Sequence, residues 1–436
     1  MKLRNVSVAL LALLLASMAM VPVVSAADSQ RISAGQDLIE ANYIPVDTAR
    51  EQATITMLNM IQSGALDENW IGAKINPTPQ EIFDINGDRL FYLFSVQKNG
   101  KRVGEIYAAA SKTLGGSVIT IGSINEPDTA KKLLEFSKKA VKENYPGYLV
   151  LSEKTVCFDY PVIGSMMTLK NQKTGEKKEI IIDSRDGSEK KMNSQVSSYY
   201  DQYSTENMKK NIATWDSQNV VMNEQKKGLL AVNPEILSKY SDFDIVKITT
   251  AFAESRTNET ASRTSLDPDG MKVLPTLTHS TQYFDDWCAV ATAQMISSKY
   301  MTPSLTPDHP SPWSQYHIGE KMGAYFPNGS PGTGTDPNKE LRYYSVSIDN
   351  GGLGKLSSID TYSPYTTWEN AKEEIDNLRP LKIGRVLPTA HARACNGWLV
   401  DGGNRYLLFY DPQYTGSIYW EFVSQGFTYG NFIYVR

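Results

Sequence analysis

Apolar and polar positions in the first half of the chain follow the periods of both helices and strands. Residues 46–62 carry apolar side chains at helical spacing, and Gly64 follows at the position of a helix C-cap. Residues 90–96 and 103–109 are rich in aromatic and β-branched side chains and flank Asn99-Gly100. This arrangement predicts a β-hairpin, because both central residues of such a turn need a positive φ angle.

Similar patterns continue to about residue 190. Residues 128–144 predict a second amphipathic helix, and strands are expected at residues 148–152, 162–169 and 179–183. Helices mixed with antiparallel strands indicate an α+β fold. We therefore expect an N-terminal α+β domain over residues 27–192.

The middle of the chain differs in composition and predicts a linker. Residues 193–227 are polar and helix-prone, and residues 249–269 are rich in Ser, Thr, Asn and Glu. We expect a helical and Ser/Thr-rich linker over residues 193–270, exposed in its second part. A second globular unit then follows over residues 271–436. More than one folded unit agrees with the length of 436 residues.

The N-terminus predicts export from the cytoplasm. Lys2 and Arg4 precede the charge-free apolar residues 8–20, and small residues suited to cleavage follow at 24–26. This order is typical of a secretory signal peptide over residues 1–26, with a retained membrane anchor as the alternative. No later stretch has the roughly 18 apolar residues of a spanning helix. We expect a mature protein without a membrane span, secreted or held at the cell surface.

Composition and charge argue against several function classes. The net charge of −4 gives no basic footprint for nucleic acid. Neither His-Glu-x-x-His nor a paired Cys-x-x-Cys occurs, so we expect no metal site and no cofactor. Asp84, Asn86 and Asp88 around Gly87 hint at a calcium loop, but the later Gly and the distant Glu of such a loop are missing. An ordinary hairpin turn is the favoured interpretation.

The chain has three cysteines, an odd number that leaves at least one free thiol. Cys288 stands directly before residues 289–300, an apolar periodic run that predicts a helix. A cysteine at a helix N-terminus feels the positive end of the helix dipole, which favours the nucleophilic thiolate. Gln282 lies upstream, and its carboxamide can donate to the oxyanion that forms when a thiolate attacks a carbonyl. Asp285 and Asp286 oppose the dipole if they point inward, or else cap the helix.

The base should be a histidine on a different element. His391 begins a predicted strand, and a second strand at residues 406–410 ends in Asp411. If the two strands are adjacent and antiparallel, Asp411 orients the imidazole and stabilises its charged form. The alternatives for this role are Asp401, Asn396 and Asn404. Cys157 and Cys395 are interpreted as packed core residues.

The order of these residues resembles the papain-like cysteine peptidase superfamily. The shared features are Gln-x5-Cys at a helix start, a later His-Ala strand and an Asp-Pro strand end. The likeness is closest to the bacteriocin-leader (double-glycine) peptidases, because the run from Trp368 to Pro380 is similar to the helix before their histidine strand. It covers about residues 272–420. It implies the following site: oxyanion donor Gln282, nucleophile Cys288, base His391 and orienting carboxylate Asp411.

The resemblance implies a papain-like α+β catalytic domain, in which a helix bearing the cysteine packs on an antiparallel sheet bearing the histidine. The N-terminal α+β domain is loosely similar to propeptide or inhibitor domains of secreted peptidases. We therefore expect a secreted cysteine peptidase, made as a zymogen, with a protein or peptide substrate and the N-terminal domain as intramolecular partner. One alternative is a binding or adhesion protein of this fold without turnover, because Arg393 and Asn396 stand where the family's strand is usually apolar. Another is transpeptidation or amide hydrolysis on cell-wall peptides.

Overall fold

The computed structural model describes most of the chain between residues 35 and 436. The described residues are 35–123, 129–190, 196, 198–231, 270–300, 314–324, 334–360, 367–385, 390–423 and 429–436. The predicted signal peptide, residues 1–26, and the Ser- and Thr-rich residues 249–269 of the predicted linker lie outside them. Below, the N-terminal half means described residues 35–231, and the C-terminal half means described residues 270–436.

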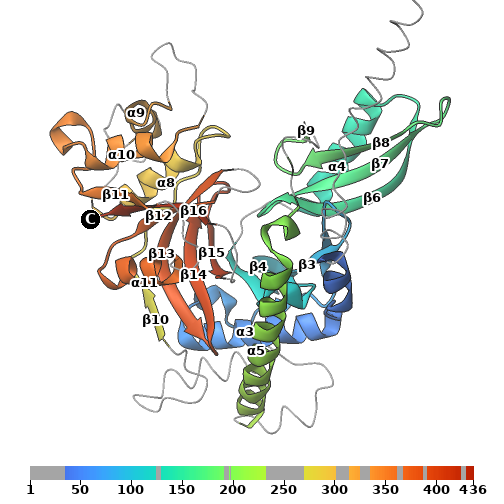
Figure 1. Ribbon diagram of the computed structural model, residues 1–436, viewed down its shortest axis with the longest axis horizontal. Helices are drawn as coiled ribbons and strands as arrows, with labels where there is room; N and C mark the ends of the chain where they lie inside the picture. Colours follow the sequence, from blue (N-terminus) through green and yellow to red (C-terminus); the bar gives the residue numbers. More distant parts are fainter. Residues whose placement is uncertain are drawn as a thin grey trace, which may run out of the picture.

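Helices and a large curled mixed sheet make up the fold, which confirms the expected α+β class (Figure 1). The helices are α3 (Val46–Ser63), α4 (Thr129–Asn144), α5 (Thr205–Ala231), α8 (Cys288–Ser297), α9 (Gln315–Lys321), α10 (Pro337–Ser345) and α11 (Thr367–Asp376). The strands of the N-terminal half are β1 (Lys74–Ile75), β2 (Gln80–Asp84), β3 (Arg89–Lys98), β4 (Lys101–Ala109), β5 (Val118–Ser123), β6 (Tyr148–Asp159), β7 (Val162–Asn171), β8 (Lys177–Asp183) and β9 (Glu189–Lys190). Those of the C-terminal half are β10 (Gly270–Val273), β11 (Ser357–Asp360), β12 (Leu381–Arg385), β13 (His391–Asp401), β14 (Asn404–Asp411), β15 (Ser417–Phe422) and β16 (Tyr429–Val435).

The described strands form one sheet that runs through both halves. Its order is β11-β16-β12-β13-β14-β15-β5-β4-β3-β2-β6-β7-β8-β9, with β1 on β3 and β10 on β13. The β2–β6 pair is parallel, and β5 pairs antiparallel with β15, with Ser123 opposite Ile418. The sheet therefore crosses from the N-terminal half to the C-terminal half without a break, as Figure 1 shows.

Elements predicted from local patterns in the N-terminal half are confirmed. α3 ends at Gly64, which has a left-handed φ of 77°. The β3–β4 turn holds Asn99 at φ 52° and Gly100 at φ 75°, and α4, β6, β7 and β8 lie where expected. The acidic turn around Gly87 joins β2 to its antiparallel neighbour β3, as the hairpin interpretation predicts.

The predicted division into two units joined by an exposed linker is not confirmed. α5 lies in the predicted linker but packs against α3. The buried apolar side chains of α5 include Met208, Trp215 and Met222. On α3, Asn59 donates to Asp401 at 3.3 Å, and Trp420 of β15 donates to the carbonyl of Ala65 at 2.9 Å. These contacts join residues far apart in sequence, so no local pattern could indicate them.

In the C-terminal half, α8 packs against β12, β13 and β14. The hydroxyl of Thr292 in α8 donates to the carbonyl of Ala392 at 3.0 Å, which ties the helix to the start of β13. All residues of α8 after Cys288 are buried, so the burial of this helix is not one-sided. Packing on the sheet thus holds the N-terminus of α8 close to the first residues of β13.

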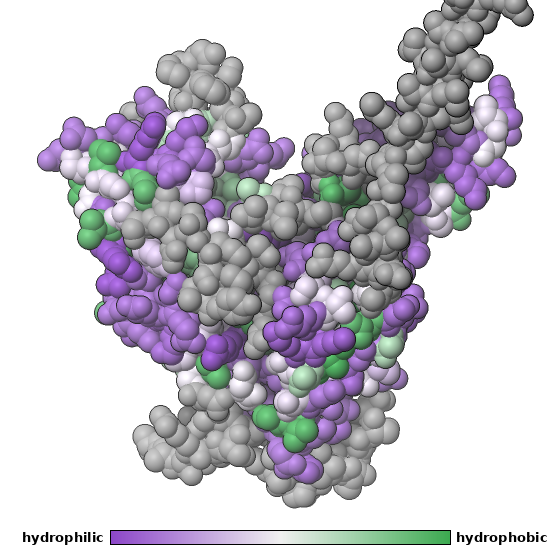
Figure 2. All heavy atoms as spheres, viewed as in Figure 1, coloured by the Kyte–Doolittle hydropathy of each residue, from purple (hydrophilic) through white to green (hydrophobic). Residues whose placement is uncertain are grey.

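The described surface seen in Figure 2 is largely hydrophilic, with small separate hydrophobic patches. It is hollowed between the part that carries α8, α9 and α10 and the part that carries α4, β7 and β8 (Figures 1 and 2). Within the ranges given above, no helix combines the length and the hydropathy needed to cross a membrane.

Candidate active site

Cys288 is the first residue of α8 and is partly exposed. Trp287 holds the N-cap position and makes no side-chain hydrogen bond to the helix. Its buried indole packs edge-on against Phe284, with ring centroids 4.6 Å apart. The alternative in which Asp285 or Asp286 caps the helix is therefore wrong. The N–H groups of the first turn have no intrahelical acceptors, so they are left for a group that binds beside Cys288.

His391 and Asp411 lie next to each other, at the ends of two neighbouring strands inside the sheet. His391 is the first residue of β13, Asp411 is the last residue of β14, and the two strands pair antiparallel. His391 Nε2 lies 2.8 Å from Asp411 Oδ1 and hydrogen-bonds to it. Cys288 lies close enough to the same imidazole to contribute to the raised pKa of His391. Because Nε2 is hydrogen-bonded to Asp411, Nδ1 is the ring nitrogen left to interact with the thiol.

The surroundings of His391 favour its protonated form. Burial by itself disfavours the imidazolium, but the charge and hydrogen bond of Asp411, together with Cys288, raise the pKa of His391 to about 9. Burial also disfavours the carboxylate of Asp411, yet His391, Arg393 and Tyr419 hold the pKa of Asp411 well below its usual range. At neutral pH an imidazolium–carboxylate pair therefore lies beside Cys288.

A buried polar network supports Asp411 from behind. Tyr419 of β15 donates to Asp411 Oδ2 at 2.6 Å, and Arg393 Nη1 donates to the Tyr419 hydroxyl at 3.0 Å. Arg393 also pairs with Glu421 at 2.5 Å and lies over the ring of Phe409 at 3.9 Å. Arg393 is thus a paired residue of the sheet next to the site. The unusual position of Arg393 on its strand is visible in the sequence, but its partners are not, because they come from two other strands, β14 and β15.

His279 is a further residue of the site that the sequence did not reveal. Its Nδ1 accepts from the backbone N–H of Gly416 at 3.3 Å, so its Nε2–H donates to the backbone carbonyl of Asp411 at 2.8 Å. Burial lowers the pKa of His279, which favours this neutral form. The imidazole thereby joins two ends of the turn after β14 and fixes the backbone at Asp411. Nothing in the sequence around His279 marks this role.

Gln282 lies beside Cys288 in the cleft, but its amide hydrogens are already used. Its Nε2 donates to the carbonyls of Phe284 and Asp285, at 3.0 and 2.6 Å. Its backbone N–H donates to the carbonyl of Pro412 at 2.9 Å, and its Oε1 is buried without a partner. In this arrangement Gln282 shapes the loop before α8. To donate to an oxyanion, it would have to release one of these carbonyls.

The other two cysteines lie away from the cleft in the core. Cys157 and Cys395 are free and buried, which confirms their interpretation as packed residues. Burial raises the pKa of Cys395 to about 12 and places that of Cys157 well above its usual range. Their thiols are therefore protonated at neutral pH, and Cys288 is the cysteine that solvent reaches.

The alternative partners of His391 contact other residues. Asp401 ends β13 and accepts from Asn59 and from Gln225. Asn396 donates to the backbone carbonyls of residues 274 and 275, and Asn404 begins β14, at the end remote from Asp411. Among the described residues, Asp411 is therefore the carboxylate that hydrogen-bonds to His391.

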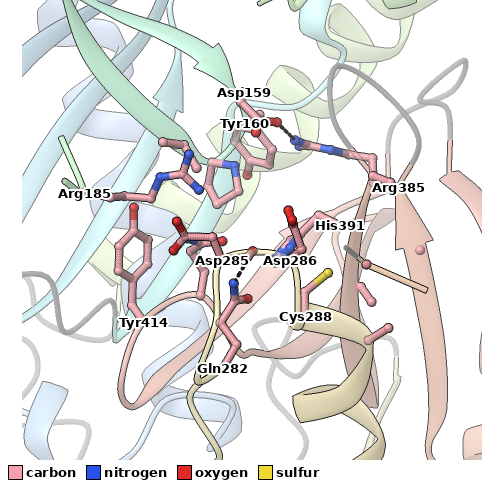
Figure 3. Close-up of a pocket in the computed structure, with 18 of the residues that line it drawn as sticks. Asp159, Tyr160, Arg185, Gln282, Asp285, Asp286, Cys288, Arg385, His391 and Tyr414 are labelled. Atoms are coloured by element: carbon pink, nitrogen blue, oxygen red, sulfur yellow. Dashed lines mark hydrogen bonds and ion pairs between the residues drawn. The ribbon is translucent and has the colours of Figure 1, made fainter. Parts of the chain in front are cut away.

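A cleft of about 740 Å³ opens in front of Cys288 and His391, between the two halves (Figure 3). The wall from the N-terminal half is formed by Asp159, Tyr160 and Arg185 (Figure 3). Tyr414, from the C-terminal half, lies near Arg185 (Figure 3). Arg385 bridges to this wall through Asp159, with Nη2 and Oδ1 3.2 Å apart. Both halves of the chain therefore contribute to the site.

The arrangement can supply a nucleophile, a proton donor and a carboxylate that holds the donor in place. Across the residues that the structure describes, no group of three or more His, Cys, Asp and Glu side chains could hold a metal ion. No protein-family model matches the chain, and no match is found among curated proteins. The chemistry of the site must therefore be inferred from its geometry.

Proposed function

We propose that the protein is a cysteine-type peptidase in which Cys288 is the nucleophile and His391 the acid and base. The observation that carries this proposal is that three separate elements, α8, β13 and β14, bring Cys288, His391 and Asp411 together. A helix that begins with the cysteine packs on an antiparallel sheet that carries the histidine. This arrangement supports the papain-like architecture implied by the sequence.

The proposed reaction begins with attack of the Cys288 thiolate on a peptide carbonyl. The uncapped N–H groups at the start of α8 stabilise the oxyanion, and Gln282 joins them once it releases a backbone carbonyl. The imidazolium of His391 then gives its proton to the leaving amine, and the C–N bond breaks. Neutral His391 next takes a proton from water, which hydrolyses the thioester and restores the thiolate. Asp411 keeps the imidazole oriented throughout.

A secreted zymogen remains part of the proposal, with the N-terminal half as intramolecular partner. The described residues of this half line the cleft and pair with β15, which supports a close association. A cut within residues 249–269 would leave that pairing in place, whereas a fragment starting at residue 270 would expose the edge of β15. The test compares casein hydrolysis by the intact chain, the cut chain and the fragment. Equal rates for the intact and the cut chain would overturn the zymogen, and fractionation of the producing cells tests secretion.

The test of the active site uses a thiol-directed probe at neutral pH. All proteins are cut within residues 249–269 before the test. We expect labelling of wild-type protein at Cys288, loss of labelling in Cys288→Ser and strongly slowed labelling in His391→Ala. Casein hydrolysis should be lost in the same two variants, and mass spectrometry of the products separates hydrolysis from transpeptidation. The buried Cys395→Ser variant serves as the control and should keep both properties. Unlabelled Cys288 with no turnover would refute the proposal and favour a binding or adhesion protein.

A further inference from the structure

Arg385 lies beside the catalytic histidine of the proposed mechanism and faces the same cleft. It is the last residue of β12, and its Cα is directly opposite that of His391 on β13. Directly opposed residues of antiparallel strands project to the same face of the sheet. Figure 3 shows the Arg385 side chain reaching toward Asp159, at the end of the cleft away from Gln282. His391 and Cys288 lie between these two ends (Figure 3).

The guanidinium of Arg385 is buried with much of its hydrogen-bonding capacity unused. The residue is only 2% exposed. Nη2 pairs with Asp159, and the guanidinium lies 5.2 Å from the ring centre of Tyr160. Nε and Nη1 are buried and have no acceptor. Arginine has five N–H donors, and a buried donor without an acceptor costs free energy. The unpaired N–H groups of these two nitrogens are thus left for a group that enters the cleft.

The other cations of the cleft already have acceptors on the protein. Arg185 and Lys190 share the carboxylate of Asp183, at 2.6 and 3.0 Å. The buried Lys382 pairs with Glu340 at 3.1 Å. Arg385 therefore differs from its neighbours among the described lining residues, because it combines burial with nitrogens that lack an acceptor.

Two acidic residues of the cleft repel an incoming anion, but this repulsion is weaker than the attraction by Arg385. Asp285 and Asp286 line the cleft and are exposed. Water screens exposed charges much more strongly than charges removed from solvent. An anionic group next to buried Arg385 thus gains more from the guanidinium than it loses to these hydrated carboxylates.

We propose that Arg385 is a specificity residue that binds a carboxylate of the peptide substrate next to the scissile bond. The planar guanidinium can hold a carboxylate by two parallel hydrogen bonds, which a single-point cation cannot do. One of them would come from Nε or Nη1 and the other from the second N–H of Nη2, whose first N–H is used by Asp159. The carboxylate comes either from an acidic side chain or from the C-terminus of the peptide. The proposal rests on the proposed peptidase function only for the nature of the ligand, a peptide.

The experiment uses N-acetylated octapeptides that differ by Glu or Gln at one position at a time, each with a C-terminal carboxylate or amide. Dissociation constants are measured with Cys288→Ala protein, which does not need turnover, and kcat/KM with wild-type protein cut within residues 249–269. We expect the peptide with Glu at one particular position, or the peptide with a free C-terminal carboxylate, to bind roughly 10- to 100-fold more tightly than its neutral counterpart. The Glu/Gln arm and the carboxylate/amide arm distinguish the two sources.

Three further variants separate recognition from a structural role. Arg385→Gln should reduce the ratio between charged and neutral peptides to about one, whereas Asp159→Asn should keep or increase it, because a competing carboxylate is removed. Arg405→Gln is the matched control and should leave the ratio unchanged, since Arg405 is exposed and pairs with Glu369. Circular dichroism checks that each variant is folded.

Several results would overturn the inference. Equal affinities within every peptide pair, or no binding of any peptide, would exclude a carboxylate site. An equal loss for charged and neutral peptides in Arg385→Gln would show that Arg385 only joins the two halves through Asp159. A carboxylate preference in binding without any turnover would instead refute the peptidase function and leave the site standing.

Discussion

Replacement of Asp411 by Asn tests the electrostatic basis of the proposed mechanism. The carboxylate makes the largest contribution to raising the pKa of His391 from its ordinary 6.5 to about 9, against the effect of burial. An amide has similar size but no charge, so in Asp411→Asn only burial and Cys288 remain to act on the imidazole. We expect His391 in this variant to titrate at or below pH 6.5. The change of about 2.5 pH units corresponds to roughly 3 kcal/mol in favour of the neutral imidazole.

The direct measurement is the NMR titration of protein labelled with [13Cε1]-histidine. The chain has four histidines, and the His391 signal is identified by its absence in His391→Asn. A second measurement is kcat/KM against pH, which depends on the protonated acid. Wild-type activity should fall as the pH rises through about 9, and activity of Asp411→Asn should already fall near pH 6.5.

Asp401→Asn is the matched control for this prediction. Asp401 is also buried and lies on the strand of His391, but at its other end. Ten residues of extended strand separate the two by about 33 Å. The variant should leave the titration of His391 near pH 9. An unchanged titration in Asp411→Asn, or an equal shift in Asp401→Asn, would refute the assignment of Asp411.

The remaining predictions concern stability and are measured by urea unfolding. Arg393→Met removes the guanidinium that pairs with the buried carboxylate of Glu421 and should cost roughly 3–5 kcal/mol. The double replacement with Glu421→Leu should cost less than the single one, and a larger loss in the double variant would contradict this. A side chain at Gly122 of β5 would meet the backbone of Tyr419 on β15. Gly122→Val should therefore cost roughly 1–3 kcal/mol and keep a single unfolding transition for both halves. The control, Gly35→Ala, has open space around the new methyl group and should be neutral. Because the pKa of His391 is raised in the folded protein, its stabilising contribution is fully present below pH 6.5 and lost as the pH rises through about 9. The difference in free energy of unfolding between wild type and His391→Asn should therefore shrink by roughly 3 kcal/mol between pH 6 and pH 10. A constant difference would count against the raised pKa.

Part of this protein was predictable from its sequence because short segments carry their own conformational signals. The turn at Asn99-Gly100 and the end of α3 at Gly64 follow from which residues tolerate positive φ angles. The start of a helix at Cys288 and the strand of His391 also followed from local patterns. Adjacent antiparallel strands were the condition under which the sequence assigned Asp411 to His391, and the pairing of β13 with β14 meets that condition.

Only the tertiary structure decided how distant segments complete the site. The pairing of β5 with β15 depends on side-chain packing and strand register across the whole sheet, to which no single segment points. The same holds for the buried partners of Arg393 and for the contact of Arg385 with Asp159, because a buried charge can be interpreted only once its neighbours are known. His279 likewise gains its role from a turn more than a hundred residues later. The sequence by itself thus determined the local elements and the order of the reactive residues, and long-range packing determined the cleft around them.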